Sequence, residues 1–138
     1  MTGLRVRDVM SRDVVTVRPD AAIGTAIDRV LRRGHTHLVV VDDDGVLVDI
    51  VSAHLLTTAL MTRLIERHQP LSDVLADPAA IRAGARLHEA AGLMMALSVD
   101  ALGVVDRQGR LVGVLTWADI GRSVAPPLTV RAERRAPG

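Results

Sequence analysis

The sequence predicts a mixed α/β (α+β) fold that contains two copies of a β-α-β-β-α unit. Aliphatic, β-branched segments alternate along the chain with segments of helical periodicity, which is typical of strands and helices in turn. The same order of segments occurs twice at a constant spacing, which indicates an internal duplication. Three pairs of residues lie 64 positions apart: Asp42 and Asp106, Gly45 and Gly109, and Ser52 and Thr116.

The first copy is predicted to begin with a short helical turn over residues 5–10. A β-branched run at 14–17 favours a strand. The next segment, 21–33, has apolar residues at the i, i+3, i+4 spacing of a helix with one buried face. Gly34 follows it and is expected to end this helix.

The middle of the first copy is predicted to be a hairpin. Residues 37–41 are aliphatic without alternation, which is typical of a strand buried on both faces. The turn at 42–45 leads to a return strand over 46–51. Ser52 is expected to cap a helix that extends to about residue 68.

The second copy follows the same order from residue 69. Asp73 lies 65 positions after Asp8, so this copy is one residue shorter before its first strand. We expect residues 1–68 to form the first repeat with a connecting helix and residues 69–124 to form the second. Residues 125–138 contain three prolines and three arginines, which predicts a disordered tail. In the second repeat, the predicted elements are a strand near 81, a helix over 85–97, and strands over 102–105 and 111–115.

The composition excludes several function classes. The chain of 138 residues has no cysteine, tyrosine or lysine, so it offers no thiol nucleophile, tyrosine acid or Schiff-base lysine. A net charge of +1 and a single aromatic residue argue against nucleic-acid binding. No apolar run approaches a membrane span, so we expect no membrane partner and a cytoplasmic location.

No catalytic or metal-binding pattern was found either. No nucleophile is paired with a base at a recognisable spacing, so we expect a protein that is not an enzyme. The histidines, at positions 35, 37, 54, 68 and 88, do not have the spacing of zinc ligands. The acidic run at 42–44 lacks the distal glutamate of a calcium loop and is expected to be a solvated turn.

The chemistry of the chain concentrates in residues 113–120, where a strand turns directly into a helix. Gly113 allows a close backbone approach, Thr116 is a good N-cap, and Asp119 lies one helical turn later on the same side. A helix start with a hydroxyl suits a phosphate, and a carboxylate suits the two hydroxyls of a ribose. Thr-x-x-Asp is also a capping box, and the two interpretations remain open. Trp117, between the two residues, is expected to lie inside the site.

The order of these motifs resembles a tandem pair of cystathionine β-synthase (CBS) domains, the Bateman module. The resemblance rests on Asp-Val-Met at 8–10, Gly-x-x-His-Leu-x-Val-Val-Asp at 34–42 and Gly-x-x-Thr-x-x-Asp at 113–119. It covers residues 4–124. It implies two repeats that pack about a pseudo-twofold axis, with clefts between them for AMP, ADP, ATP or S-adenosylmethionine.

The resemblance also implies which residues bind the ligand. Thr116 and the helix start would face the phosphate, and Asp119 would accept from the ribose. The remaining positions are Val14, Val15 and Val114 at the adenine, Thr36 and His37 at the phosphates, and Val39 where the family often has proline. The alternatives are that the valines are plain core and that His37 is a polar residue with its hydrogen bonds satisfied.

The cleft of the first copy departs from the family pattern. Asp49 replaces the glycine, and Leu55 replaces the ribose-binding acid, whereas Ser52 keeps the N-cap. Asp100 adds a further acid on the second copy. We therefore expect one ligand per chain, in the cleft of Thr116 and Asp119.

These features predict a non-catalytic regulatory module that binds an adenosine ligand and signals to an unknown client protein. The alternative is a dimeric interaction scaffold that has lost nucleotide binding. The helix over 87–97 is apolar nearly all round, which favours self-association, and the resemblance implies a homodimer in the form of a four-repeat disc. Further apolar residues that favour self-association are Leu55, Leu56, Leu60, Met61 and Leu64.

Overall fold

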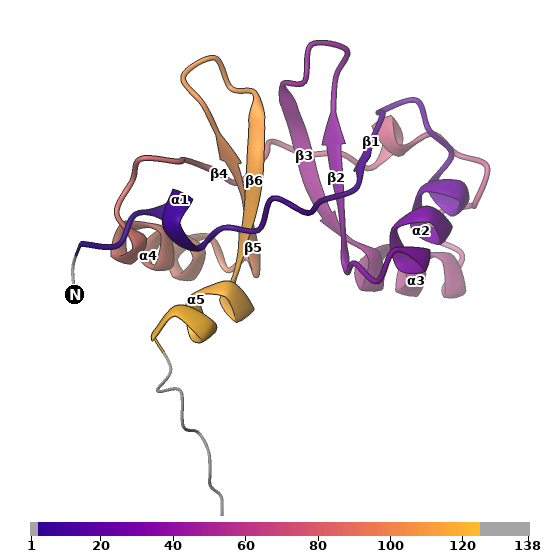
Figure 1. Cartoon of the computed structure of the whole chain (residues 1–138). Coiled ribbons are helices and arrows are strands. Elements are labelled where there is room, and N and C mark those ends of the chain that lie inside the picture. Colours follow the sequence, from indigo (N-terminus) through magenta and orange to yellow (C-terminus); the bar gives the residue numbers. More distant parts are fainter. Residues whose placement is uncertain (1–2, 125–138) are drawn as a thin grey trace, which may run out of the picture.

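The computed structural model describes residues 3–124 and contains two three-stranded sheets with helices outside them (Figure 1). In each sheet the first strand pairs in parallel with the second, and the second pairs antiparallel with the third. This arrangement confirms the predicted mixed α/β class. The strands are β1 (Thr16–Val17), β2 (His37–Val41) and β3 (Leu47–Ser52) in one sheet, and β4 (Ala80–Arg82), β5 (Ala101–Val105) and β6 (Leu111–Thr116) in the other.

The helices are shorter than the predicted segments at several ends. They are α1 (Val6–Val9), α2 (Ile23–Arg32), α3 (Ala53–Met61), α4 (Leu87–Leu97) and α5 (Trp117–Val124), with a 3-10 turn, η1, over Leu71–Asp73. None of the helices within residues 3–124 combines the length and the hydropathy that a bilayer crossing requires. The predicted disordered tail, residues 125–138, lies outside the described residues.

The duplication extends to the hydrogen-bond register of the two sheets. Val40 pairs with Asp49 in the first hairpin, and Val104 pairs with Gly113 in the second. Both hairpins then shift register at the next residue, so that each has an irregularity at the equivalent place. The constant sequence spacing therefore reflects two hairpins with the same register, because register depends on the number of residues between paired positions.

The helix predicted to extend from Ser52 to about residue 68 ends instead at Met61, so that prediction was wrong. Arg63 adopts a left-handed conformation (φ 62°), and the N–H of Leu64 donates to the carbonyl of Ala59 over 2.9 Å. This is a Schellman-type end, in which one left-handed residue reverses the chain. Gly34 (φ 77°) ends α2 in the same way, as predicted.

The chain after α3 turns back to the start of α2. The N–H of Ile23 donates to the carbonyl of Gln69 over 2.8 Å, and the N–H of Gly24 donates to the carbonyl of Arg67 over 3.0 Å. The first amides of a helix have no partner within it. Residues 62–70 therefore act as a backbone cap for α2, which is a role that a continuous helix could not fill.

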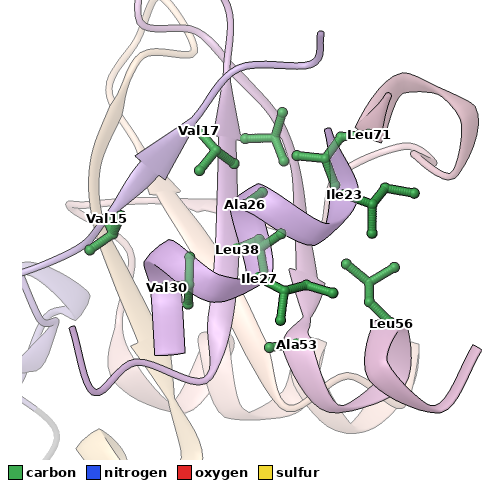
Figure 2. Close-up of a cluster of buried hydrophobic side chains, with 11 residues drawn as sticks. Val15, Val17, Ile23, Ala26, Ile27, Val30, Leu38, Ala53, Leu56 and Leu71 are labelled. Atoms are coloured by element: carbon green, nitrogen blue, oxygen red, sulfur yellow. The ribbon is translucent and has the colours of Figure 1, made fainter. Parts of the chain in front are cut away.

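Three apolar clusters hold the fold together. One lies between the first sheet and helices α2 and α3 (Figure 2), and one lies between the second sheet and α4. The third lies between the two sheets and contains Val39, Leu47, Ala101 and Val114. Strands β3 and β5 contact each other across this third cluster.

The part of each repeat that precedes its first strand, here called the lead segment, packs on the other repeat. The first lead segment contains α1 and precedes β1, and the second contains η1 and precedes β4. Val6, in α1, is fully buried in the cluster of the second sheet, and the N–H of Val6 donates to the carbonyl of Ala85 over 2.9 Å. Leu71, in η1, is fully buried beside Ile23 in the cluster of the first sheet (Figure 2). The division at residues 68 and 69 is thus a division of the sequence, and packing crosses it in both directions.

The exchange of lead segments predicts that Leu71→Ala destabilises the first repeat although Leu71 belongs to the second in sequence. Removing a fully buried leucine leaves a cavity, and we expect a loss of about 2–5 kcal/mol in the free energy of unfolding. Urea unfolding followed by circular dichroism measures this loss. Leu64→Ala is the control, because Leu64 is 79% exposed. Equal stability of the two variants would contradict the exchange.

Candidate functional site

A cavity of about 150 Å³ lies between the two repeats and brings together all eight predicted ligand-binding residues. The first repeat contributes the extended segment before β1 and the start of β2. The second repeat contributes the end of β6 and the start of α5. The predicted residues that line it are Val14, Val15, Thr36, His37, Val39, Val114, Thr116 and Asp119.

Three further residues line the same cavity and were not predicted: Ser11, Asp13 and His35. His35 is half-buried, and its Nε2 lies 3.9 Å from Asp13 Oδ1. Only their position in the sequence could have suggested these three residues, since each lies within three residues of a predicted lining residue. Their side chains carry no motif of their own.

Thr116 and Asp119 form a complete capping box at the start of α5. The N–H of Thr116 donates to Asp119 Oδ2 over 2.9 Å, and the N–H of Asp119 donates to Thr116 Oγ1 over 3.2 Å. The second carboxylate oxygen, Oδ1, accepts from the guanidinium of Arg122, one turn further on. Asp119 is only 5% exposed. The capping interpretation is therefore correct, and the same carboxylate also lines the cavity.

The close approach predicted at Gly113 is made by the chain itself. Ser11 and Val114 exchange two backbone hydrogen bonds of 2.8 and 2.9 Å, which tie the lead segment to β6. A Cβ at Gly113 would lie 2.9 Å from the carbonyl oxygen of Ser11, a distance that real Cβ atoms essentially never show. A side chain at this position would therefore push the lead segment away from the strand.

In the first repeat, a side chain attaches the other lead segment to the strand. Asp49 stands at the position of Gly113, and its Oδ2 accepts from the N–H of Ala76 over 2.9 Å. Its Oδ1 accepts from the N–H of Ile50 over 2.7 Å. Ala76 is 65 residues after Ser11, which is the offset of the two lead segments. Asp49 thus holds the second lead segment where Ser11 and Val114 hold the first, a role that its sequence position did not reveal.

Asp49 also lines a second, larger cavity of about 680 Å³, which is the cleft of the first copy. Ser52 and Leu55 lie on its wall, together with Asp77 and Asp100. Ser52 keeps the N-cap, since its Oγ accepts from the N–H of Leu55 over 3.2 Å. Leu55 is 66% exposed and offers no polar atom where the other cleft has Asp119.

Trp117 lines this larger cavity and not the cavity of Thr116 and Asp119, so its expected place was wrong. Successive residues of a helix point about 100° apart. Thr116 and Asp119, three positions apart, share one side of α5, and Trp117 turns away from it. Fluorescence of this tryptophan therefore reports on the first cleft.

His37 lies on the wall of both cavities. Its Nε2 is 3.0 Å from Asp100 Oδ1, and its Nδ1 is 3.0 Å from Thr36 Oγ1. The imidazole therefore has hydrogen-bond partners on both nitrogens, which agrees with the interpretation of a satisfied polar residue. It also connects a residue of one cleft wall to a residue of the other.

Three of the four predicted valines are buried and belong to apolar clusters: Val15, Val39 and Val114. These valines therefore belong to the core and also line the cleft, because the cavity lies against the cluster between the sheets. Val14 is half-buried on the same wall. Within residues 3–124, no group of three or more histidine, aspartate or glutamate side chains is arranged to hold a metal ion.

Comparison with known proteins gives relatives along most of the chain. Homoserine O-acetyltransferase of Methanococcoides burtonii is 32% identical over 128 residues, which is 90% of this chain and 25% of that protein. Inosine-5′-monophosphate dehydrogenase of Methanocaldococcus jannaschii is 30% identical over 92% of this chain and 25% of its own length. The chain thus spans about a quarter of the length of these curated relatives.

Solved structures share the fold. The crystal structure of CBSX2 in complex with AMP superimposes with a TM-score of 0.74 at 28% identity, covering 88% of this chain and 96% of that chain. The sequence pattern of the CBS domain matches twice, over residues 6–62 and 71–125. These two matches correspond to the two sheets and their helices, and the chain therefore belongs to the CBS domain family, as a tandem pair of CBS domains.

Proposed function

We propose that this chain is a non-catalytic regulatory module that binds one adenosine ligand in the cleft of Thr116 and Asp119. The observation that supports this function is the convergence of eight predicted residues, from both repeats, on one cavity. The candidate ligands are AMP, ADP, ATP and S-adenosylmethionine. CBSX2, which is 28% identical, has been crystallised with AMP.

The cavity offers a separate wall for each part of such a ligand. Val15, Val39 and Val114 give an apolar surface for a purine ring, and the extended backbone at Val14 can contact its edge. The carboxylate of Asp119 can accept from ribose hydroxyls, because an ionised carboxylate has about four acceptor sites and two are in use. Thr36 and His37 lie at the wall that the 5′ substituent would reach.

A ligand at this place can regulate because it touches both repeats. Thr36 and Val14 belong to the first repeat, whereas Val114, Thr116 and Asp119 belong to the second. A ligand shifts an equilibrium only when it binds two states with different affinity. Contact with both repeats makes its affinity depend on their relative position, and a client protein can respond to that position.

The first cleft is not expected to bind an adenosine ligand in the same manner. Leu55 cannot accept from ribose hydroxyls, and Asp49 brings a nearly buried carboxylate to the wall of this cleft. Asp77 and Asp100 add negative charge to its wall. We therefore propose a stoichiometry of one ligand per chain.

Self-association through the helices is the second part of the proposal. Several large apolar side chains on α3 and α4 are exposed, among them Met61 at 80% and Met95 at 72%. Trp117 on α5 is also exposed, and it shares the wall of the first cleft with Leu55 and Met95. Apolar side chains gathered from three helices favour a homodimer, which would form the four-repeat disc that the family resemblance implies.

A dimeric interaction scaffold without nucleotide binding remains the second candidate. One observation favours it: the capping box and Arg122 already engage both oxygens of the Asp119 carboxylate. In this case the helix cap is the whole role of the Thr-x-x-Asp motif.

The ligand hypothesis predicts that Asp119→Asn weakens adenosine-ligand binding. Asparagine keeps an oxygen that can accept from the N–H of Thr116, but it loses the charge that strengthens hydrogen bonds to ribose hydroxyls. Charged hydrogen bonds contribute about 1.5–3 kcal/mol, so we expect a roughly 10- to 100-fold loss of affinity. Isothermal titration calorimetry with each candidate ligand measures the affinity and the stoichiometry.

Leu55→Asn is the matched control, because it places the same residue at the equivalent position of the other cleft. This variant should bind as the unmodified chain does. Circular dichroism before each titration separates loss of binding from loss of fold. If no candidate ligand binds the unmodified chain at millimolar concentration, the scaffold function replaces the regulatory one.

The dimer hypothesis predicts a sedimenting mass of about twice the 14.8 kDa chain at micromolar concentration. The double variant Met61→Glu with Met95→Glu should sediment as a monomer, because a dimer would have to bury two carboxylates in its apolar contact. Gln108→Glu with Arg107→Gln changes the charge of an exposed hairpin turn and serves as the control. An unmodified chain that sediments as a monomer would refute the homodimer.

A further inference from the structure

We propose that the cleft of Thr116 and Asp119 selects an adenosine ligand whose 5′ substituent is uncharged or cationic over one that carries a 5′-phosphate. The inference rests on the proposed function, since it names the class of ligand within the same site. It is derived from the charges that line the cleft and from the hydrogen bonds that its polar groups already make.

The ionisable side chains on the cleft wall are two aspartates and two histidines: Asp13, Asp119, His35 and His37. Each histidine faces a carboxylate, since His35 Nε2 lies 3.9 Å from Asp13 Oδ1 and His37 Nε2 lies 3.0 Å from Asp100 Oδ1. Among the described residues, those that line this cleft include no arginine, and the sequence has no lysine. A phosphate in the cleft would therefore face carboxylates without a permanent cation on the wall.

The guanidinium of Arg122 contacts one lining residue, Asp119, but the carboxylate of Asp119 already balances the charge of this guanidinium. Arg122 donates to Oδ1 of Asp119 and projects from α5 with an exposed side chain. A bound phosphate would have to compete with the carboxylate of Asp119 for this guanidinium. The same competition would remove the partner of a nearly buried aspartate, which is unfavourable.

The helix start is also less available to an anion than the motif suggests. A helix N-terminus attracts anions through its free N–H groups and its dipole. Here the N–H of Asp119 already donates to Thr116 Oγ1, and the Asp119 carboxylate supplies a negative charge at the helix start. The protein's own carboxylate thus occupies the electrostatic position that a phosphate would take.

The adjacent cleft adds to the negative potential. Asp49, Asp77 and Asp100 line its wall, and His37 belongs to both walls. Carboxylates near a partly buried site repel an anion more than they would in water, because the effective dielectric constant is lower there. A neutral thioether or a sulfonium at the 5′ position avoids this repulsion.

The size of the cleft favours a short 5′ substituent. Its volume of about 150 Å³ is smaller than the roughly 300–1,000 Å³ of typical small-molecule pockets. An adenosine group with a short substituent needs less additional opening of the cleft than a nucleoside triphosphate.

The test compares 5′-methylthioadenosine with AMP, because these ligands share the base and the ribose and differ in the charge of the 5′ group. Calorimetric titrations at pH 8 and low ionic strength should give at least tenfold tighter binding of 5′-methylthioadenosine, with ATP weaker than AMP. AMP binding that equals or exceeds thioether binding overturns the inference and leaves the proposed function intact. Failure of these three ligands and also of ADP and S-adenosylmethionine to bind overturns the proposed function as well.

A charge-removal variant tests the cause of the preference. Asp13→Asn with Asp100→Asn removes two carboxylates that face the histidines, and the affinity for AMP relative to the affinity for the thioether should rise by about three- to tenfold. Asp20→Asn with Asp44→Asn removes the same charge from exposed positions outside the cleft and should change neither affinity. A relative AMP affinity that rises equally in both double variants, or in neither, overturns the electrostatic argument.

Discussion

The exchange of lead segments between the repeats is the constraint on which the rest of this structure depends. Val6 completes the apolar cluster of the second sheet, and Leu71 completes that of the first. Neither repeat has a full core without a segment from the other, so the two sheets are held face to face. The residues that lead into the first strand of each sheet line the clefts, Asp13, Val14 and Val15 in one and Asp77 in the other.

The two clefts differ because the lead segments are anchored in different ways. A backbone bridge between Ser11 and Val114 requires Gly113, whereas the second lead segment is tied by the carboxylate of Asp49 to the N–H of Ala76. The glycine lets the first lead segment approach β6 closely, and the aspartate brings a nearly buried charge to the wall of the larger cleft. One substitution in a duplicated position thus changes both the anchoring and the electrostatics.

In this protein a helix-capping carboxylate also lines the proposed ligand cleft. The carboxylate of Asp119 closes the start of α5, pairs with Arg122 and still lines the cleft. Such a group is held in one orientation before any ligand arrives, which lowers the entropy cost of recognition. In the proposed ligand site, the same engagement would disfavour a further negative charge, so that ligand choice would depend on the local structure of one helix turn.

The sequence by itself determined the duplication and the order of strands and helices, because periodicity and spacing are local properties. Thr116 and Asp119 followed from their own motif, whereas the other six predicted residues of the cleft were expected only from the resemblance to CBS domains. The end of α3 at Met61 was not predictable, since it depends on the left-handed Arg63 and on a return to α2. The helical period already turns Trp117 away from the side of Thr116 and Asp119, but tertiary structure alone decided which cavity it faces, that Asp49 accepts from the N–H of Ala76, and that His35 lines the cleft. These features depend on contacts between segments that are distant in the chain or on the direction in which one helix is docked, and neither is encoded in a local pattern.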